Sequence, residues 1–122
     1  MKTLILTILI IAGSSNVLLS QAIAKNLGVP PMTASQRKQI VTNAKVLAGN
    51  QLAQFRAILN LTVEENNQVY RILVNYNLTD KQQINNPRYS IAKNRSVRDN
   101  LLSKVLDPSQ FLTYTNTPNL HY

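Results

Sequence analysis

The sequence predicts an all-α fold of four to five helices, and three observations carry that prediction. A five-residue pattern typical of helix starts occurs four times. Between those starts, apolar residues return at steps of three and four, which is the spacing of one helix face. No stretch alternates apolar and polar residues, and no Asn-Gly turn marks a pair of strands. We therefore expect helices throughout the folded part of the chain.

The repeated pattern is a Leu or Met, then Thr or Asp, two variable residues, and then Gln or Glu. In a capping box the Thr or Asp side chain accepts from an amide of the first helical turn, and the Gln or Glu reaches back to the cap residue. Pro108 would occupy the first helical position of the last copy, where its missing amide costs nothing. The expected capping pairs are Thr33 with Gln36, Thr62 with Glu65, Thr79 with Gln82, and Asp107 with Gln110.

The first 24 residues have the pattern of a cleavable signal peptide. Lys2 supplies a positive start, an apolar run follows from Leu4 to Ala12, and Ala22-Ile23-Ala24 is a small-x-small cleavage site. The run is short for a membrane span, and a membrane anchor is the alternative. The chain has no cysteine, which argues against disulfide-dense secreted scaffolds. We expect a bacterial periplasmic or secreted protein whose mature chain begins at Lys25, with no stable membrane insertion after cleavage.

The expected domain organisation is a linker over residues 25–32, one helical domain over 33–115, and a flexible, polar tail over 116–122. The linker ends in Pro30-Pro31, which cannot continue a helix. A chain of this length forms one small domain with a thin core.

Within the domain, the first helix is expected from Thr33 to Leu59, with Gly49-Asn50 as a point where it could divide. The second opens at Thr62, and its apolar residues surround most of its circumference, which indicates either the central helix of the fold or a helix that also contacts a partner. The third copy of the pattern either starts a new helix or lies within a continuous one that ends by Asn86, before Pro87. Two further helices are expected, from about Arg88 to Val105 and after Asp107.

Strong positive charge is the main clue to partners. The chain has 13 Lys and Arg against five Asp and Glu, a formal net charge of +8, and no acidic residue between Lys25 and Leu61. Such a charge favours nucleic acid, anionic lipid or acidic polypeptide. For an exported protein nucleic acid is the weakest of these, and we expect no nucleic-acid partner.

Three arginines of the fourth expected helix, Arg88, Arg95 and Arg98, stand at steps of seven and three and so share one helical stripe. An ordinary solvated face is the alternative, but Asp99 is the one acidic residue in that segment, and unbalanced positive charge favours a negative partner. The candidate client-binding residues are Arg37, Lys38, Lys45, Arg56, Arg88, Arg95 and Arg98.

Catalytic chemistry has little support in the sequence. The chain has no thiol, no Gly-x-Ser-x-Gly elbow and no glycine-rich phosphate loop. Its one histidine, His121, falls in the expected tail, and Glu64, Glu65 and Asp107 occupy first-turn positions that helix dipoles favour. We expect no enzymatic activity, no cofactor and no metal site. Three Asn-x-Ser/Thr sequons, at Asn60, Asn77 and Asn94, leave glycosylation in a eukaryotic secreted protein as an alternative.

Pentapeptides of this kind, in a short basic chain behind a signal peptide, resemble those of the Spy/CpxP group of periplasmic stress chaperones. Leu78-Thr79-Asp80-Lys81-Gln82 matches the Leu-Thr-x-x-Gln motif of that group in full, whereas Glu65 and Asp107 replace its Gln and Thr in two other copies. The resemblance implies an elongated arrangement of helical hairpins that forms a homodimer. It also implies binding of unfolded proteins without ATP on a basic, partly apolar face.

The function expected from the sequence is therefore a chaperone-like holdase or an envelope-stress binding protein for unfolded or acidic clients. One alternative is an interaction or sensor protein of the same fold with a single dedicated partner. Another is a secreted, membrane-active basic helical protein, which would release dye from anionic vesicles.

Overall fold

The computed structural model describes residues 32–122, so the expected signal peptide and nearly all of the expected linker lie outside the described part. The helices are α2 (Ala34–Leu59), α3 (Val63–Gln83), α4 (Ile91–Val105) and α5 (Pro108–Thr115), followed by the 3-10 turn η1 (Pro118–Leu120). Between residues 32 and 122 there is no strand. The predicted all-α fold is confirmed.

Three of the four pentapeptides form capping boxes. At the start of α2, Thr33 Oγ1 accepts from the Gln36 amide at 3.1 Å, and Gln36 Oε1 accepts from the Thr33 amide at 2.8 Å. The same reciprocal pair of bonds opens α3 at Thr62 and α5 at Asp107. Each box satisfies two backbone amides that a helix start would otherwise leave without a partner.

The fourth pentapeptide, Leu78–Gln82, lies inside α3 and does not begin a helix. Helix α3 begins at Val63, so the backbone amides that follow Thr79 lie in the helix interior. Thr79 therefore has no helix start to cap. The next helix, α4, begins at Ile91 rather than near Arg88. Its cap is Ser90, whose Oγ accepts from the Lys93 amide at 3.3 Å.

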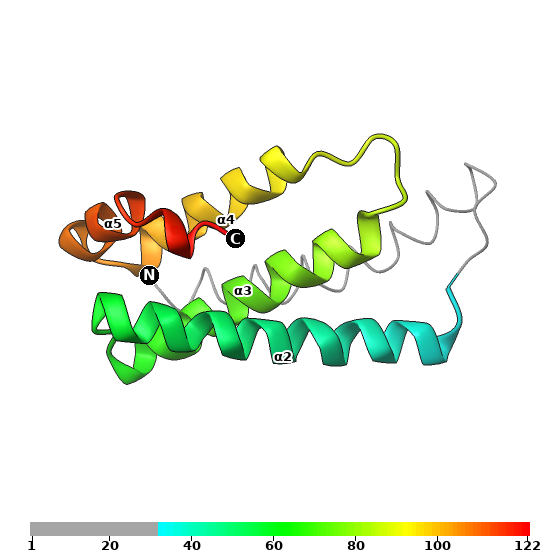
Figure 1. Ribbon diagram of the computed structural model, residues 1–122, viewed down its shortest axis with the longest axis horizontal. Coiled ribbons are helices and arrows are strands. Elements are labelled where there is room, and N and C mark those ends of the chain that lie inside the picture. The colour runs from blue at the N-terminus through cyan, green and yellow to red at the C-terminus, as the bar shows by residue number, and fades with distance from the viewer. Residues whose placement is uncertain (1–31) are drawn as a thin grey trace.

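Helix α3 is the central element of the described chain. It runs antiparallel to α2 as a helical hairpin, and α4 returns along its other side, while α5 and η1 lie over one end (Figure 1). Helices α2 and α4 make no direct backbone contact with each other. The broad apolar circumference of α3 therefore serves two neighbours within one chain. The largest fully buried side chains are Tyr114, Phe55, Ile72, Leu73, Leu102 and Leu120.

The long helix α2 continues through Gly49-Asn50 without a break, so the possible division of the helix there does not occur. A Cβ atom at Gly49 would meet no other atom within 4 Å. The helix ends instead at Asn60, which adopts the left-handed conformation with φ 51°. Asparagine tolerates this conformation better than most non-glycine residues, which makes it a suitable helix terminator.

The prediction of a frayed tail over residues 116–122 is wrong. Segment Thr117–Tyr122, called the closing segment below, contains the η1 turn and packs back onto the helices. Leu120 is fully buried in the core, and the Tyr122 ring lies 6.3 Å from the Phe55 ring. Tyr122 Oη also donates to Gln54 Oε1 of α2 at 2.5 Å. The segment therefore contributes to the core, where Leu120 belongs to the same buried cluster as Phe55 and Leu102.

Two of the three glycosylation sequons are built into the fold. The Asn77 side chain is buried, and its amide donates to Gln51 Oε1 across the α2–α3 contact at 2.8 Å. The Asn94 amide donates to the Tyr76 carbonyl at 3.0 Å. A glycan on either nitrogen would remove these bonds and could not fit between the helices. Asn60 is the sequon that remains exposed.

Candidate functional site

A stripe of three exposed cations runs along one side of α2. Lys38, Lys45 and Arg56 are all exposed, and their spacings of seven and eleven residues are close to two and three full helical turns. At 1.5 Å per residue the stripe is about 27 Å long. We call these three residues the basic stripe. No acidic residue occurs between Thr33 and Leu61, so α2 itself supplies no carboxylate to pair with them.

Arg37 lies next to the basic stripe in sequence but not on the same side of the helix. Its Nη1 donates to the Met32 carbonyl at 2.6 Å, so the side chain folds back over the start of α2 and is partly buried. Arg37 therefore holds residue 32 against the first turn of α2. Of the four α2 residues expected to bind clients, the structure places three together.

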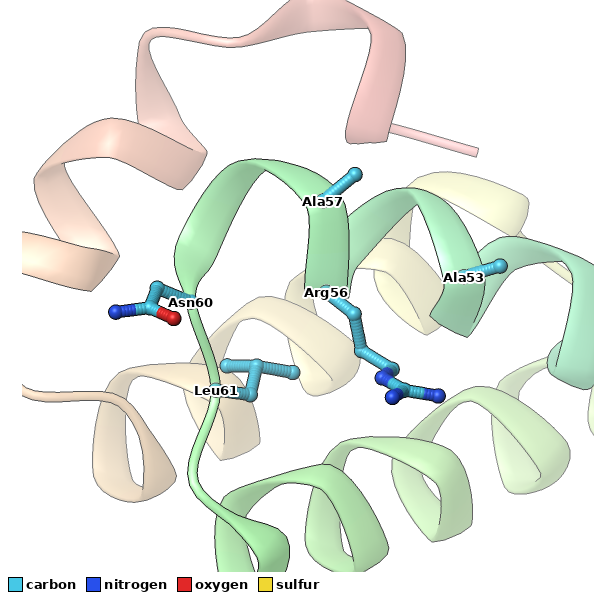
Figure 2. Close-up of a pocket in the computed structure, with 5 residues that line it drawn as sticks. All are labelled: Ala53, Arg56, Ala57, Asn60 and Leu61. Carbon is cyan, nitrogen blue, oxygen red and sulfur yellow. The ribbon is translucent and has the colours of Figure 1, made fainter.

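A shallow hollow of about 390 Å³ lies beside the last cation of the stripe. Its walls are the small side chains of Ala53 and Ala57, the Arg56 stem, and Asn60 and Leu61 of the loop that follows (Figure 2). Among the described residues, Arg56 makes no ion pair or hydrogen bond through its guanidinium. The hollow thus places the Arg56 cation beside the small side chains of Ala53 and Ala57 and the polar Asn60, and an acidic side chain fits that combination.

The second expected group of cations, Arg88, Arg95 and Arg98, does not form one exposed face. Arg88 lies in the loop before α4 and is exposed, and Arg95 is exposed on α4. Arg98, however, is only 3% exposed. Arg98 stands four residues from both Asn94 and Leu102, which are buried, and so belongs to the core-facing side of α4. The prediction of a three-arginine client stripe on α4 is therefore wrong.

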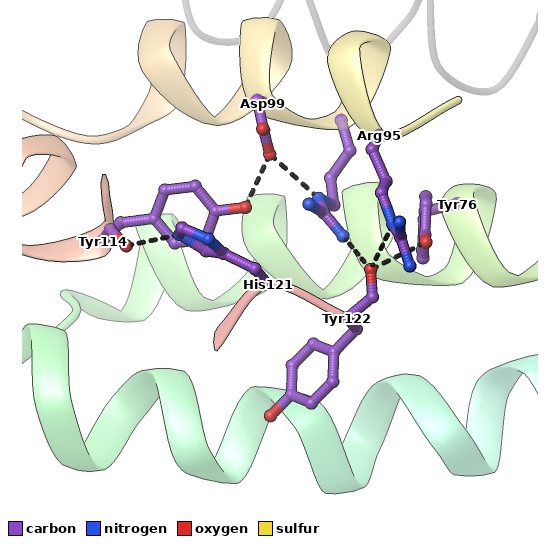
Figure 3. A network of polar contacts seen from close by, with 7 residues as sticks. Tyr76, Arg95, Asp99, Tyr114, His121 and Tyr122 are labelled. Atoms are coloured by element: carbon purple, nitrogen blue, oxygen red, sulfur yellow. Dashed lines mark hydrogen bonds and ion pairs between the residues drawn. The ribbon is translucent and has the colours of Figure 1, made fainter. Parts of the chain in front are cut away.

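Buried Arg98 is held by three kinds of partner (Figure 3). Its Nε pairs with Asp99 Oδ1 at 3.0 Å, its Nη1 donates to the Tyr122 main-chain oxygen at 2.7 Å, and its guanidinium carbon lies 4.7 Å from the centre of the Tyr76 ring. A buried charge is stable only with such compensation. Arg98 is therefore bound to the fold's own groups.

The carboxylate and rings around Arg98 extend the same network. Tyr114 Oη donates to Asp99 Oδ1 at 2.6 Å, and burial together with this carboxylate raises the pKa of Tyr114 well above its ordinary value. The His121 ring is tilted against the Tyr114 ring, with their centroids 4.8 Å apart, and His121 Nε2 lies 2.8 Å from the Tyr114 carbonyl. A carbonyl only accepts, so Nε2 carries the proton in this contact. His121 is therefore exposed but held against Tyr114, and it does not belong to a frayed tail.

A second carboxylate–tyrosine contact lies at the start of α4. Tyr89 Oη donates to Asp80 Oδ1 at 2.9 Å and accepts from the Asn94 amide at 3.1 Å. Partial burial and the Asp80 bond raise the pKa of Tyr89 to about 12. The bond fixes the α3–α4 connection and leaves the tyrosine protonated, which is a structural role.

Within residues 32–122, no group of three or more His, Asp or Glu side chains is placed to hold a metal ion. No helix in the same range is long and apolar enough to cross a membrane. The two clusters that the structure does form are the basic stripe with its adjoining hollow and the Arg98 network under the closing segment. Charge alone predicted the three cations of the first cluster, but neither the hollow beside Arg56 nor the Arg98 network.

Comparison with known proteins adds no relative: no family model, no curated protein and no solved structure matches this chain. The resemblance to the Spy/CpxP group stays a prediction from the pentapeptides.

Proposed function

We propose that this protein is an exported, ATP-independent, chaperone-like binding protein that engages unfolded or acidic polypeptides through the basic stripe of α2. The observation that carries the proposal is the stripe itself: Lys38, Lys45 and Arg56 are exposed on one side of a helix that has no acidic residue. An unbalanced row of positive charge repels itself and attracts negatively charged chains.

The spacing of the stripe suits extended polypeptides more than a compact ligand. Lys38 and Lys45 are separated by about 10 Å along the axis, and Lys45 and Arg56 by about 16 Å. These distances are comparable with or longer than the Debye length of about 8 Å at physiological salt, so each cation attracts a separate carboxylate. Val46 is 60% exposed on the same helix and adds apolar contact area.

The proposed clients are therefore chains that carry scattered acidic residues and exposed apolar side chains, as partly unfolded proteins do. Binding of this kind needs no nucleotide, because it draws on charge and apolar contact that are present from the start. The Spy/CpxP resemblance adds a bacterial periplasmic location and a homodimer to the proposal. Sedimentation of the purified mature chain tests the homodimer.

The experiment is light scattering of two unrelated aggregating clients, one acidic and one basic, with and without the purified chain at low and high salt. The proposal expects stronger suppression for the acidic client and weakening of that suppression by salt, because exposed charges are screened. No suppression of either client, or suppression that salt does not change, contradicts it.

A single dedicated partner is the second candidate, and the hollow beside Arg56 favours it. A hollow with one cation between small side chains can select one side chain, whereas a stripe of separate charges cannot. Ala53→Leu would fill the hollow while leaving all three cations in place. Loss of one saturable interaction in that variant, with unchanged suppression of general aggregation, supports the dedicated partner; unchanged binding contradicts it.

A further inference from the structure

The main-chain oxygen of Tyr122 is surrounded by three hydrogen-bond donors from two helices. Tyr76 Oη of α3 donates to it at 2.8 Å, and Arg95 Nε and Arg98 Nη1 of α4 donate at 3.1 Å and 2.7 Å (Figure 3). A neutral carbonyl commonly accepts one or two bonds from neutral groups. Here two of three donors are guanidinium groups.

The charges around this oxygen favour an anion. Arg98 is almost completely buried and has one carboxylate partner, Asp99, which it contacts through Nε and not through the Nη1 that faces Tyr122. Arg95 makes no ion pair among the described residues. Two cations with one carboxylate leave a net positive charge at the oxygen. Hydrogen bonds from guanidinium groups are about twice as strong to an ionised acceptor as to a neutral one.

The closing segment contacts the helices through several of its side chains as well as through this oxygen. Leu120 inserts into the core, the Tyr122 ring packs near Phe55, and Tyr122 Oη donates to Gln54. One end of the segment, Thr117, is joined to α5 through the bond from its amide to the Tyr114 carbonyl at 3.1 Å. The helices therefore contact an apolar residue, an aromatic residue and a main-chain oxygen of the segment in a fixed order.

We propose that Tyr76, Arg95 and Arg98 form a carboxylate-binding site, which the closing segment occupies in this conformation and for which a peptide ending in an aromatic residue with a free carboxylate competes. Release of the segment uncovers Arg98 and frees the guanidinium groups of both arginines to bind such a peptide. This site is separate from the basic stripe of α2, and the argument for it does not depend on the proposed function.

The test uses the synthetic peptide Thr-Pro-Asn-Leu-His-Tyr, labelled at its amino end and prepared with either a free carboxylate or an amide at its other end. Its host is the full chain with Leu120→Ala and Tyr122→Ala, which weakens the closing segment. Fluorescence anisotropy should show binding to this host at least about ten-fold tighter than to the unmodified chain, because the tethered competitor is weakened. The amide should bind about ten-fold more weakly than the carboxylate, since it lacks the charge that the guanidinium groups prefer.

Matched substitutions on α4 separate this site from general attraction to a basic protein. Arg95→Gln in the same host should lower carboxylate binding about ten-fold, whereas Lys93→Gln, an exposed cation two residues away, should leave it unchanged. Equal affinity for carboxylate and amide, or equal effects of the two substitutions, overturns the proposal. If circular dichroism shows that the double variant is unfolded, Tyr122→Ala alone serves as the host, because it keeps Leu120 in the core, and the same outcomes apply.

Discussion

Leu120→Ala tests directly whether the closing segment belongs to the core. Leu120 is fully buried against side chains from the helices, although it stands near the end of a stretch that the sequence suggests is polar and frayed. Truncating a buried leucine to alanine costs about 2–5 kcal/mol in free energy of unfolding. The cost here belongs at the lower end, about 2–3 kcal/mol, because the segment can detach once its anchor is lost.

For a domain of this size, each kcal/mol corresponds to a shift of about 4–8 °C in Tm, so the expected loss is roughly 8–24 °C. Urea unfolding followed by far-UV circular dichroism measures the free energy, and a thermal melt measures Tm. The matched control is Leu112→Ala, the same substitution at a leucine of α5 that is 62% exposed, where a change within about 0.5 kcal/mol is expected. Equal small effects of the two substitutions would refute the packed segment.

Three further predictions address the helices and the Tyr114–Asp99 contact. Gly49→Ala should stabilise the protein by about 0.5–1 kcal/mol in urea unfolding, because the added methyl meets open space and α2 is continuous there; destabilisation would contradict that continuity. Thr62→Ala should lower the free energy of unfolding by about 0.5–2 kcal/mol, because it removes the cap of α3. Thr42→Ala in the interior of α2 is the control and should not lower it. Equal losses in the two variants would argue against the capping box. Because the pKa of Tyr114 is raised in the folded state, the contribution of Tyr114 to stability is complete below about pH 10 and falls as the pH rises further. Urea midpoints should therefore decline above pH 10 less steeply in Tyr114→Phe than in the unmodified chain. An identical pH dependence in the two proteins would exclude the contact with Asp99 as the source of the decline.

Helix starts were predictable because a capping box is local. The bonds at Thr33, Thr62 and Asp107 join residues three apart, so the sequence contains both partners. The same locality explains the failure at Thr79. A pentapeptide alone does not show whether it starts a helix or lies inside one. The fourth copy lies inside α3, which begins at Val63. Ser90 was missed since it caps α4 without the Gln or Glu that completes a box.

The positions of the cations were only half predictable. Lys38, Lys45 and Arg56 lie on the outer side of α2 and are exposed, as expected for charged side chains. Arg98 is charged but buried. Asp99 is its counterion, the Tyr76 ring is its aromatic neighbour, and the Tyr122 main-chain oxygen accepts its hydrogen bond. Two of those partners are more than 20 residues away. Its four-residue spacing from Leu102 is a usable signal for a core-facing position, although arginine side chains are mostly exposed.

The closing segment could not be predicted from local pattern. Leu120 and Tyr122 stand among polar residues without the periodicity of a helix or strand. Their burial depends on contacts with α2, α3 and α4, which can form only once those helices have packed together. Tertiary contacts of this kind leave no trace in spacing or composition.

The most direct test of the central claim, that the basic stripe of α2 binds clients, compares two charge-matched triple variants for affinity to an acidic unfolded client at low salt. One carries Lys38→Gln, Lys45→Gln and Arg56→Gln; the other carries Arg71→Gln, Lys93→Gln and Lys104→Gln, all exposed cations of α3 and α4. Both lose three positive charges, so overall attraction falls equally. The account predicts a clear loss of affinity in the α2 variant and a much smaller one in its control, with helix content unchanged in both. Equal losses would show that net charge, and not the stripe, attracts the client.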